Sequence, residues 1–447
     1  MICQVQRWKS LERWVPGGNA DWECVHPLVS LDALLTPRIE HVRVNQTLGE
    51  WTPITIHFDG SIVPRERNTP FKGTMFAAYP GDLIFSKIDA RNGAISLIPE
   101  SLQKVVVTSE YPIHTVNTSL IEGCYMAMLL RTPNFLKLIR NSGSGTSGRK
   151  RITPENFRAI EIPLPDLEEQ RYLIAAYQQG LDRAAELDAQ AQRIERDAQR
   201  EFEAALGLTP PPNLPKRPFQ IAHFRDIERW SHEGILQRSP MPSEDSAEGF
   251  STATLGEAVN DIENGWSVQC ASRPARDGEW AILKISAVST GTFDPNQNKA
   301  LLPKYRPRPA LEVHPGDLII SRCNITRLVG VSAMIRTTPP RLMLCDKLFR
   351  VIFKQDSPIH PEFLNAVLRV SSVRQQIEMK VTGTSPTMKN ISKQSLLELV
   401  LPLPAPQIQE LLAEEWQKRL RQAASLRNQA AELRTTAWND FITAVFT

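Results

Sequence analysis

The stretch EIPLPDLEEQ at residues 161–170 joins two kinds of local structure. An apolar strand pattern ends at two prolines, and a helical pattern rich in charged and amide side chains follows. The stretch LVLPLPAPQIQ at 399–409 has the same arrangement. Proline fixes φ and disfavours helical backbone in the residue before it, so neither strand pattern continues past its prolines. Each stretch therefore predicts the point where a globular domain ends and a long helix begins.

The similarity between these two stretches extends along most of the chain. Matching segments occur in the same order in both halves, and the residue offset between them only increases, as expected if loops lengthened in one copy. Chance similarity would scatter the offsets, so the sequence predicts an internal duplication. The longest matches are YPGDLIFSKIDARNG at 79–93 with HPGDLIISRCNITRLVG at 314–330, and GTSGRKRITPENFRAIEIPLP at 145–165 with GTSPTMKNISKQSLLELVLPLP at 383–404.

Each copy mixes strand and helix patterns. Short runs such as DLIFSKI and KVVVTS, with DLIISRC and KLFRVIF in the second copy, predict strands. Helical patterns at 125–140 and 361–377 interrupt them. The predicted fold class is α+β, with two pseudo-repeated domains that contain mixed or antiparallel sheets. The predicted boundaries are a first domain at 1–166, a first spacer helix at 167–208, a proline-rich linker at 209–218, a second domain at 219–405 and a second spacer helix at 406–447.

The two long helices have the spacing of coiled-coil partners. Apolar and small residues alternate at intervals of three and four, which is the pattern of a heptad seam. Forty residues of helix span ~60 Å. We expect the two helices to form an antiparallel coiled coil; the alternative is that each helix packs on its own domain. The seam residues are Ile174, Tyr177, Leu181 and Ala184 in the first helix and Ala423, Leu426, Ala430, Leu433 and Ala437 in the second.

The overall composition limits the functional classes. With 52 basic and 49 acidic residues, the chain has a net charge of +3, so contacts to nucleic acid require local basic patches. The six cysteines form no CxxC pair or zinc-spaced cluster, which indicates a reduced compartment. The N-terminal residues lack the apolar core of a signal peptide, and no apolar run approaches the ~20 residues of a membrane helix. We expect a cytoplasmic protein without a membrane segment.

No catalytic motif is complete. Asn68-Thr69-Pro70-Phe71 lacks the first proline of the Asn-Pro-Pro-aromatic motif of amino-methyltransferases. Glu362 and the Glu378-Met379-Lys380 group lie in helical patterns, where their carboxylates would not converge as in a PD-(D/E)xK nuclease. The glycine-rich stretch at 143–148 lacks the lysine of a phosphate-binding loop, and the histidines have no metal-ligand spacing. We expect no catalytic, cofactor or metal site in this chain.

Two loops in each copy carry side chains suited to DNA. Arginine and lysine pair with guanine, asparagine pairs with adenine, and all of them reach phosphates, as do serine and threonine. A solvated loop charge is the alternative for each residue alone. The candidates are Lys87, Arg91, Asn92, Thr146, Ser147, Arg149, Lys150 and Arg151 in the first copy, and Arg322, Asn324, Thr326, Arg327, Thr384, Ser385, Thr387 and Lys389 in the second. Further basic loops are PRERNTPFK at 64–72 and PKYRPRP at 303–309.

The framework and the loops differ in how well the two copies match. The strands, the PGD turns and the proline junctions recur, whereas the loop side chains change, as in KIDARN at 87–92 against RCNITR at 322–327. A duplicated framework with different contact loops is what the reading of two different short sequences would need.

A GD-L-I strand, a Gly-Thr-Ser loop, a short helix and an (I/L)PLP stretch before a Gln- or Glu-rich helix together resemble the specificity (S) subunit of type I restriction–modification systems. The resemblance covers essentially the whole chain. IPLPDLEEQRYLI is the typical junction, and LPLPAPQIQELLA departs from it by losing the Glu-Gln pair.

The resemblance implies a non-catalytic subunit used in phage defence. Each copy would be a target-recognition domain that reads one half of a bipartite, asymmetric site in double-stranded DNA. The spacer helices would act as a ruler on which two methyltransferase (M) subunits dock, with restriction and translocase (R) subunits in the complex. S-adenosylmethionine and ATP with Mg²⁺ would bind those partners, which carry out DNA methylation and cleavage.

Two other hypotheses remain open from the sequence. One is the specificity subunit of another methyltransferase-based defence system, such as a type IIB assembly. The other is a coiled-coil scaffold that assembles proteins without contacting DNA.

Overall fold

The structure is a computed structural model and describes residues 25–42, 50–65, 74–141, 151–208, 250–383, 385 and 388–447. By its internal contacts the chain divides into two compact units. Unit 1 comprises residues 1–188 with 428–447, and unit 2 comprises residues 189–427. Each unit therefore contains one domain together with a part of both long helices.

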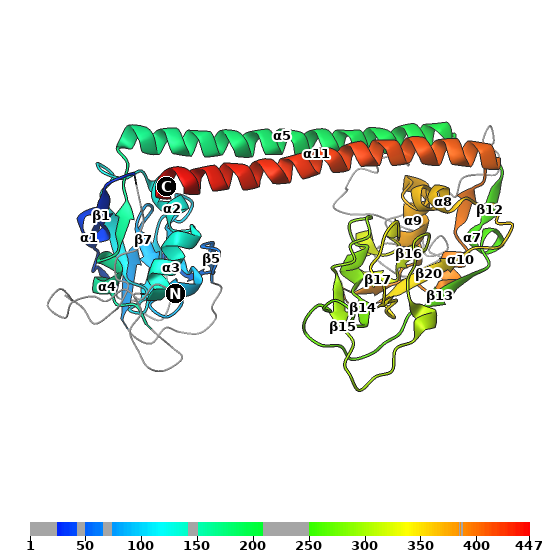
Figure 1. The fold of residues 1–447 in the computed structure, drawn as a ribbon, viewed down its shortest axis with the longest axis horizontal. Coiled ribbons are helices and arrows are strands. Elements are labelled where there is room, and N and C mark those ends of the chain that lie inside the picture. Colours follow the sequence, from blue (N-terminus) through cyan, green and yellow to red (C-terminus); the bar gives the residue numbers. More distant parts are fainter. Residues whose placement is uncertain are drawn as a thin grey trace. The chain divides into compact units, whose positions relative to one another are not determined.

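Unit 1 has a mixed α/β domain (Figure 1). A four-stranded antiparallel sheet has the order β2-β10-β7-β8, and a five-stranded sheet has the order β3-β6-β9-β4-β5 with β4 and β9 parallel. Strand β1 pairs with β11 just before the long helix. The strands are β1 (Leu28–Ser30), β2 (Leu35–Pro37), β3 (His41–Val42), β4 (Thr52–Ile56), β5 (Ile62–Pro64), β6 (Met75–Ala78), β7 (Leu83–Phe85), β8 (Ile95–Leu97), β9 (Val105–Thr108), β10 (Ile113–Val116) and β11 (Glu161–Pro163).

The helices of this domain are short. The helical pattern predicted over 125–140 forms two helices, because the Thr132 hydroxyl donates to the Leu129 carbonyl and accepts from the Phe135 N–H. Pro133 then starts the second helix, where its missing N–H costs nothing. The helices are α1 (Leu31–Leu34), η2 (Ala90–Asn92), α2 (Gly123–Leu129), α3 (Pro133–Asn141) and α4 (Pro154–Arg158).

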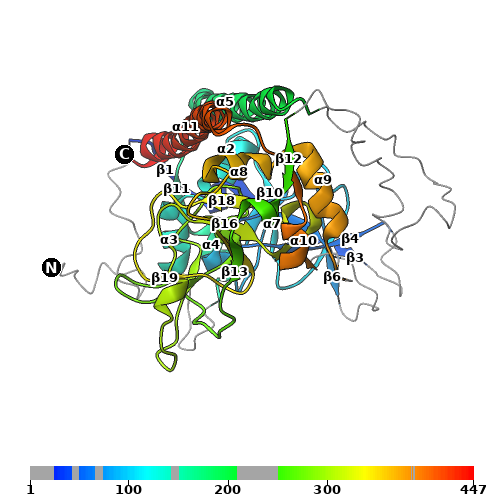
Figure 2. The ribbon, with the colours of Figure 1, turned by 90° about the vertical axis from the view of Figure 1, so that its right-hand side faces the viewer.

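Unit 2 has a second mixed α/β domain. Its four-stranded antiparallel sheet has the order β13-β20-β16-β18, and α8 lies next to β18 (Figure 2). A three-stranded sheet has the order β15-β14-β19 with β14 and β19 parallel. The strands are β12 (Thr252–Thr254), β13 (Asp261–Asn264), β14 (Ala281–Leu283), β15 (Asn298–Ala300), β16 (Leu318–Ser321), β17 (Cys323–Asn324), β18 (Ser332–Met334), β19 (Leu342–Met343), β20 (Leu348–Ile352), β21 (Lys389–Asn390) and β22 (Val400–Pro402).

The helical pattern predicted over 361–377 in this domain also forms two helices, because Val370 is extended, with φ −65° and ψ 149°. Strand β12 pairs with β22 just before the second long helix, as β1 pairs with β11 before the first. The helices are α7 (Leu255–Ala258), η4 (Ile285–Ala287), η5 (Pro309–Leu311), η6 (Thr326–Leu328), α8 (Pro361–Val367), α9 (Ser371–Lys380) and α10 (Lys393–Leu397).

The long helices are α5 (Leu167–Ala205) and α11 (Pro406–Phe446). Within unit 1, Tyr177 of α5 packs against Trp438 of α11 with ring centroids 5.8 Å apart, and Gly180 lies against Ala437. Within unit 2, Phe202 packs against Trp416 at 5.4 Å, and Arg419 forms a 2.8 Å ion pair with Glu201. Within each unit, a higher residue number in α5 contacts a lower residue number in α11. The two helices are therefore antiparallel in each unit.

The helix ends also belong to the domain cores. Leu173 and Phe441 are buried in the main core of unit 1. Phe202 and Trp416 are buried in the main core of unit 2. Each long helix therefore packs on a domain as well as on the other helix. None of the described helices is long and apolar enough to cross a membrane.

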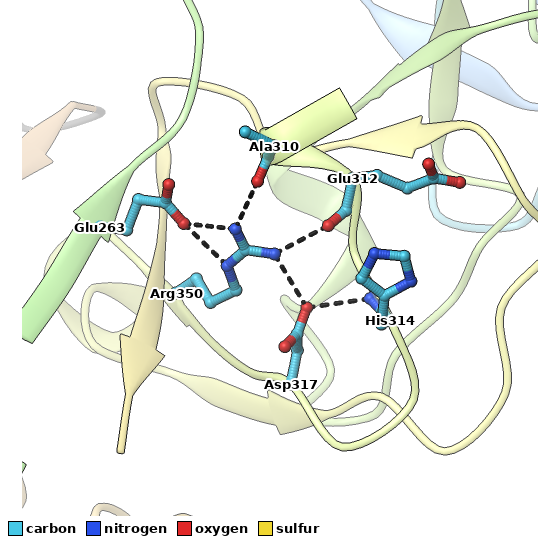
Figure 3. Close-up of polar contacts among 6 residues, drawn as sticks. All are labelled: Glu263, Ala310, Glu312, His314, Asp317 and Arg350. Atoms are coloured by element: carbon cyan, nitrogen blue, oxygen red, sulfur yellow. Dashed lines mark hydrogen bonds and ion pairs between the residues drawn. The ribbon is translucent and has the colours of Figure 1, made fainter. Parts of the chain in front are cut away.

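The PGD turns are structural. Asp82 accepts the Tyr79 N–H and pairs with Arg38 at 2.8 Å, and Asp317 accepts the His314 N–H at 2.9 Å. Gly81 and Gly316 have positive φ, which suits glycine in such a turn. In unit 2, Asp317 also binds Arg350, which reaches Glu263 and the carbonyls of Ala310 and Glu312 (Figure 3).

The second junction departs from the sequence interpretation. Only the glutamate is lost: Gln409 occupies the position of Gln170, and both side chains are buried. Gln170 Nε2 donates to the Pro165 carbonyl at 2.9 Å, and Gln409 Nε2 donates to the Pro404 carbonyl at 2.8 Å. The glutamine was overlooked because Ile408 precedes it in place of Glu169.

Candidate nucleic-acid interface

In unit 1 the two predicted contact loops meet at one backbone position. The Ile152 N–H donates to the Lys87 carbonyl at 3.0 Å, and the Lys87 N–H donates to the Glu110 carbonyl at 3.0 Å. Ile152 is buried and directly follows Arg151, so Arg151 lies beside the residues that come after β7. Residues 87–92 and Arg151 therefore share one surface.

The same arrangement occurs in unit 2. The Ile391 N–H donates to the Arg322 carbonyl at 3.0 Å, and the Arg322 N–H donates to the Lys347 carbonyl at 3.0 Å. Strand β17 pairs with β21, which places Asn324 opposite Lys389. Lys87 and Arg322 thus occupy matching backbone positions, with a different cation in each domain.

Four cations gather on the unit 1 surface. Lys87, Arg91, Arg140 and Arg151 line one small depression together with three isoleucines. Arg140 Nε donates to the Arg91 carbonyl at 3.2 Å, and Arg151 lies 3.5 Å from the Glu110 carboxylate while more than half exposed. Glu110 beside Arg151 and Glu155 near Lys87 offset these four cations only in part, so the depression favours anions.

Arg140 was not among the predicted residues. It lies in the last turn of α3, and the matching position in the second half of the sequence is Glu378, so the comparison of the two halves gave no signal for it. In unit 2, Arg374 of α9 takes a related place, since its Nη2 donates to the Arg327 carbonyl at 3.3 Å. The fold, and not the local sequence, brings these arginines to the loops.

The remaining unit 1 candidate, Asn92, is exposed, and its amide donates to Asp89 at 3.3 Å. In unit 2, Arg322 donates to the Asp346 carbonyl at 3.1 Å and lies 5.7 Å from the Phe349 ring. Such contacts fix where a guanidinium points and leave its other N–H groups for a ligand.

The other unit 2 candidates line the same edge. Asn324 Nδ2 lies 3.4 Å from the Ser289 hydroxyl, and Lys389 Nζ donates to the Gly383 carbonyl at 2.9 Å. Thr326 is half-buried in η6, while Arg327 and Ser385 are exposed. Thr146, Ser147, Arg149, Lys150, Thr384 and Thr387 lie outside the described residues.

Unit 2 adds an aromatic cluster beside this edge. The Arg308 guanidinium lies 4.3 Å from the Trp266 ring, and Tyr305 packs edge-on to Trp266 at 5.9 Å. The Asp346 N–H donates to the Trp266 carbonyl at 3.3 Å, so the cluster adjoins Lys347. The basic loop at 303–309 signalled this group only in part, because its packing on Trp266 depends on the fold.

The cysteines near this edge are unsuited to chemistry. Burial raises the pKa of the Cys345 thiol to about 12, and burial also raises the pKa of Cys323. A thiol acts as nucleophile or metal ligand as the thiolate, which these pKa values disfavour at neutral pH. Among the described residues, no three His, Cys, Asp or Glu side chains are grouped so as to hold a metal ion.

Residues 74–196 match the model of the type I restriction modification DNA specificity domain. This span runs from β6 into α5 and includes Lys87, Arg151 and Gln170. This chain is related to the specificity subunits of type I restriction–modification systems.

Curated specificity subunits match this chain over long spans. The type I restriction enzyme EcoEI specificity subunit of Escherichia coli is 23% identical, over 87% of this chain and 76% of that protein. The EcoKI specificity subunit of E. coli strain K12 is 24% identical, over 60% of this chain and 53% of that protein.

One solved structure shows a similar fold, and a second is matched with a lower score. A chain from a study of complex assembly and conformational transition of the type I R-M system has a TM-score of 0.51 and 18% identity, covering 96% of this chain and 99% of its own. The HsdS subunit from Thermoanaerobacter tengcongensis has a TM-score of 0.42 and 18% identity, covering 96% of this chain and 98% of its own.

Proposed function

We propose that this specificity-subunit relative is the non-catalytic DNA-recognition subunit of a type I restriction–modification complex. Each domain would read one half of a bipartite, asymmetric target. The observation that carries the proposal is the matched pair of loop junctions, where Lys87 and Arg322 have the same backbone hydrogen bonds and different side chains. Identical supports with different cations and amides suit two half-sites of different sequence.

The surfaces at these junctions have the chemistry that duplex DNA needs. Lys87, Arg91, Arg140 and Arg151 provide positive charge in unit 1, where phosphates would bind. In unit 2, Asn324 and Lys389 lie opposite each other on paired strands, and Arg322 is oriented by Asp346. Such oriented donors suit base edges as well as phosphates.

We further propose that α5 and α11 form an antiparallel coiled coil that spaces duplicated target-recognition domains, with the boundaries given by the sequence. The antiparallel contacts within each unit support this arrangement. Tyr172 is 71% exposed two residues after Gln170, and Leu411 is 68% exposed two residues after Gln409. Equivalent exposed apolar side chains on the two helices suit two copies of one partner chain, which we take to be the M subunits.

Grooves on the helices accompany these side chains. Tyr172 lines a groove of about 710 Å³ in unit 1, and Leu411 lines one of about 880 Å³ in unit 2. We assign S-adenosylmethionine, ATP and Mg²⁺ to the M and R subunits. This chain would then contribute recognition and assembly.

The proposal is tested with the chain assembled with its M subunits. Affinity for a duplex carrying the methylated site should fall steeply with salt, because phosphate contacts release counterions. Lys87→Met should weaken binding through one half-site and Arg322→Met through the other, each lowering the salt slope by about one unit if the contact is to phosphate. Loss of a bidentate base contact would cost about 1–3 kcal/mol at one base pair.

Matched controls remove a lysine from the far end of a neighbouring strand. Lys104 precedes β9, and the opposite end of β9 leads to Glu110, which binds Lys87. Lys354 follows β20, and the opposite end of β20 adjoins Lys347, which binds Arg322. Lys104→Met and Lys354→Met should bind DNA as the unmodified complex does. A complex that assembles but shows no salt-dependent binding to any duplex would instead support a scaffold without a DNA role.

A further inference from the structure

One short helix in each domain is anchored by a buried glutamine at one end and by a half-buried arginine at the other. In unit 1 this helix is α2, and Gln170 from the start of α5 binds the residues that lead into it. Gln170 Oε1 accepts the Glu122 N–H at 2.8 Å, and Nε2 donates to the Leu120 carbonyl at 3.0 Å. Gln170 is fully buried, so α5 is bonded directly to the segment that begins α2.

The other end of α2 is bonded to the contact loop. Arg131 Nη1 donates to the Gly93 carbonyl at 2.7 Å, and Nη2 donates to the Ile95 carbonyl. Gly93 directly follows η2, which contains Arg91 and Asn92. The Arg131 guanidinium also lies against Gly60, whose φ of +83° and lack of a side chain permit the approach.

Unit 2 repeats both anchors on α8. Gln409 Oε1 accepts the His360 N–H at 2.8 Å, and Nε2 donates to the Pro358 carbonyl at 2.9 Å. Arg369, beyond the other end of α8, donates to the carbonyls of Gly291 and Ser332. Gly291 has a φ of +76° and lies against Arg369, as Gly60 lies against Arg131.

The position of Arg369 explains how it bears on the contact edge. Gly291 follows Ser289, whose hydroxyl lies 3.4 Å from Asn324 Nδ2. Ser332 follows the η6 segment that contains Arg327. The arginine therefore holds the two backbone segments that flank the unit 2 candidates.

These arginines are unusual cations. In the described part of the chain neither forms an ion pair within 4.0 Å, and burial lowers the pKa of both guanidinium groups. Backbone carbonyls are their acceptors, so removing either guanidinium would leave buried carbonyls without a donor. Each guanidinium group binds carbonyls of a segment that is distant in sequence from the arginine itself.

The helices between the anchors are packed into the domain cores. Tyr125, Met126 and Leu129 of α2 are fully buried, as are Phe363 and Leu364 of α8. A helix of seven residues spans ~10 Å. Each therefore connects the long helix to the contact loop through packed structure with a hydrogen-bonded side chain at each end.

We propose that α2 and α8 are struts that fix the DNA-contact loops relative to the long helices, with Gln170 and Arg131, and Gln409 and Arg369, as their positioning residues. This inference rests on the proposed function. The glutamine sets the direction in which the long helix leaves the domain, and so the separation of the half-sites. The arginine sets the shape of the loop that reads each half-site.

The glutamine is tested by the spacing of the DNA target. The complex with M subunits is measured on duplexes with the correct spacer and with spacers one base pair longer or shorter. Gln170→Leu should reduce discrimination between these spacers by about tenfold, which corresponds to about 1.4 kcal/mol, with base preferences in both half-sites unchanged. Gln178 is an exposed amide further along α5, and Gln178→Leu should have no effect.

The arginine is tested by base discrimination. Arg131→Met should reduce discrimination in the half-site read by unit 1 and leave the other half-site unchanged; Arg369→Met should do the reverse. In free energy of binding to the duplex with the correct spacer and half-sites, the double variant Gln170→Leu/Arg131→Met should lose less than the sum of the two single losses, because both changes cut one connection. If Arg131→Met does not fold, Arg131→Lys, which keeps one cationic donor, should give the same half-site effect in weaker form.

Several results would overturn the strut. The first is that Gln170→Leu weakens DNA binding equally at every spacer length. The second is that Arg131→Met reduces base discrimination in both half-sites. The third is that the losses of binding free energy in the double variant are strictly additive. Failure of the unmodified complex to bind any duplex would instead contradict the proposed function, so the two failures are distinguishable.

Discussion

The pH dependence of unit 1 should depend on His114 in β10. Its ring is 1% exposed and stacks on Phe85 at 5.9 Å, and neither ring nitrogen has a hydrogen-bond partner in the structure. Burial lowers the pKa of His114 to about 4; Arg158 lowers it further, and Glu155 partly opposes the shift. The native ring is therefore neutral at physiological pH.

The sign and size of the effect follow from linkage. Below pH ~6.5 the unfolded chain binds a proton that native His114 does not bind until about pH 4, so stability falls as the pH falls through this window. Between pH 8 and pH 5 the loss should be about 2 kcal/mol. In unit 2 the matching position is Val351, since β20 pairs with Leu318 there as β10 pairs with Leu83 at His114.

The perturbation is therefore His114→Val. The measurement is native-state hydrogen exchange of β7 and β10 in the full chain at pH 8 and pH 5, because a chain of two units need not unfold in one step. From pH 8 to pH 5, the opening free energy of these strands should fall by about 2 kcal/mol more in the unmodified protein than in the variant. An equal decrease in both would refute the reasoning, whatever the absolute stability of the variant.

Three further perturbations follow from contacts described above. Arg350→Met should destabilise unit 2 by about 3 kcal/mol, because Glu263, Asp317 and two carbonyls lose their donor; thermal unfolding checks this, and exposed Arg306→Met should change little. Gly180→Leu should separate α5 from α11 in unit 1, since even a Cβ would lie 2.6 Å from that of Ala437; unchanged exchange protection of residues 428–446 would contradict it. A heptad inserted in both long helices should lengthen the spacer by about three base pairs, from ~10 Å of helix; mapped methylation should then show the same half-sites, and an altered half-site with the old spacer would exclude a ruler.

Much of the fold was predictable because its signals are local. Apolar runs such as 83–85 and 318–321 are short strands, and the prolines at 163–165 and 402–404 precede the long helices. Residues 87–92 and 322–327 could be selected as candidate contact loops because they combine cations and amides after matching strands, and their contact with DNA stays a prediction. That Ile152 would bind Lys87, and Ile391 would bind Arg322, depends on the sheets and had no local signal.

The buried polar contacts were not predictable in this way. Arg131 and Arg369 read as ordinary surface cations, because their acceptors are carbonyls of segments far away in sequence. Gln409 was overlooked because its preceding neighbour differs from that of Gln170. Arg140 reaches the unit 1 surface only through the packing of α3. A signal for Arg131, Arg369 and Gln409 exists in the matched segments of the two halves, where a polar residue recurs while its neighbours change.

The backbone bonds at Lys87 and Arg322 have an evolutionary consequence. Main-chain N–H and C=O groups hold these positions in both domains, so these backbone bonds persist whichever side chain is present, and only Arg322 adds a side-chain bond, to the Asp346 carbonyl. Exchanges there should be nearly neutral for stability while they alter the ligand. A gene of this kind could acquire a new binding preference through a few codon changes, or by recombining one half, without an intermediate that fails to fold.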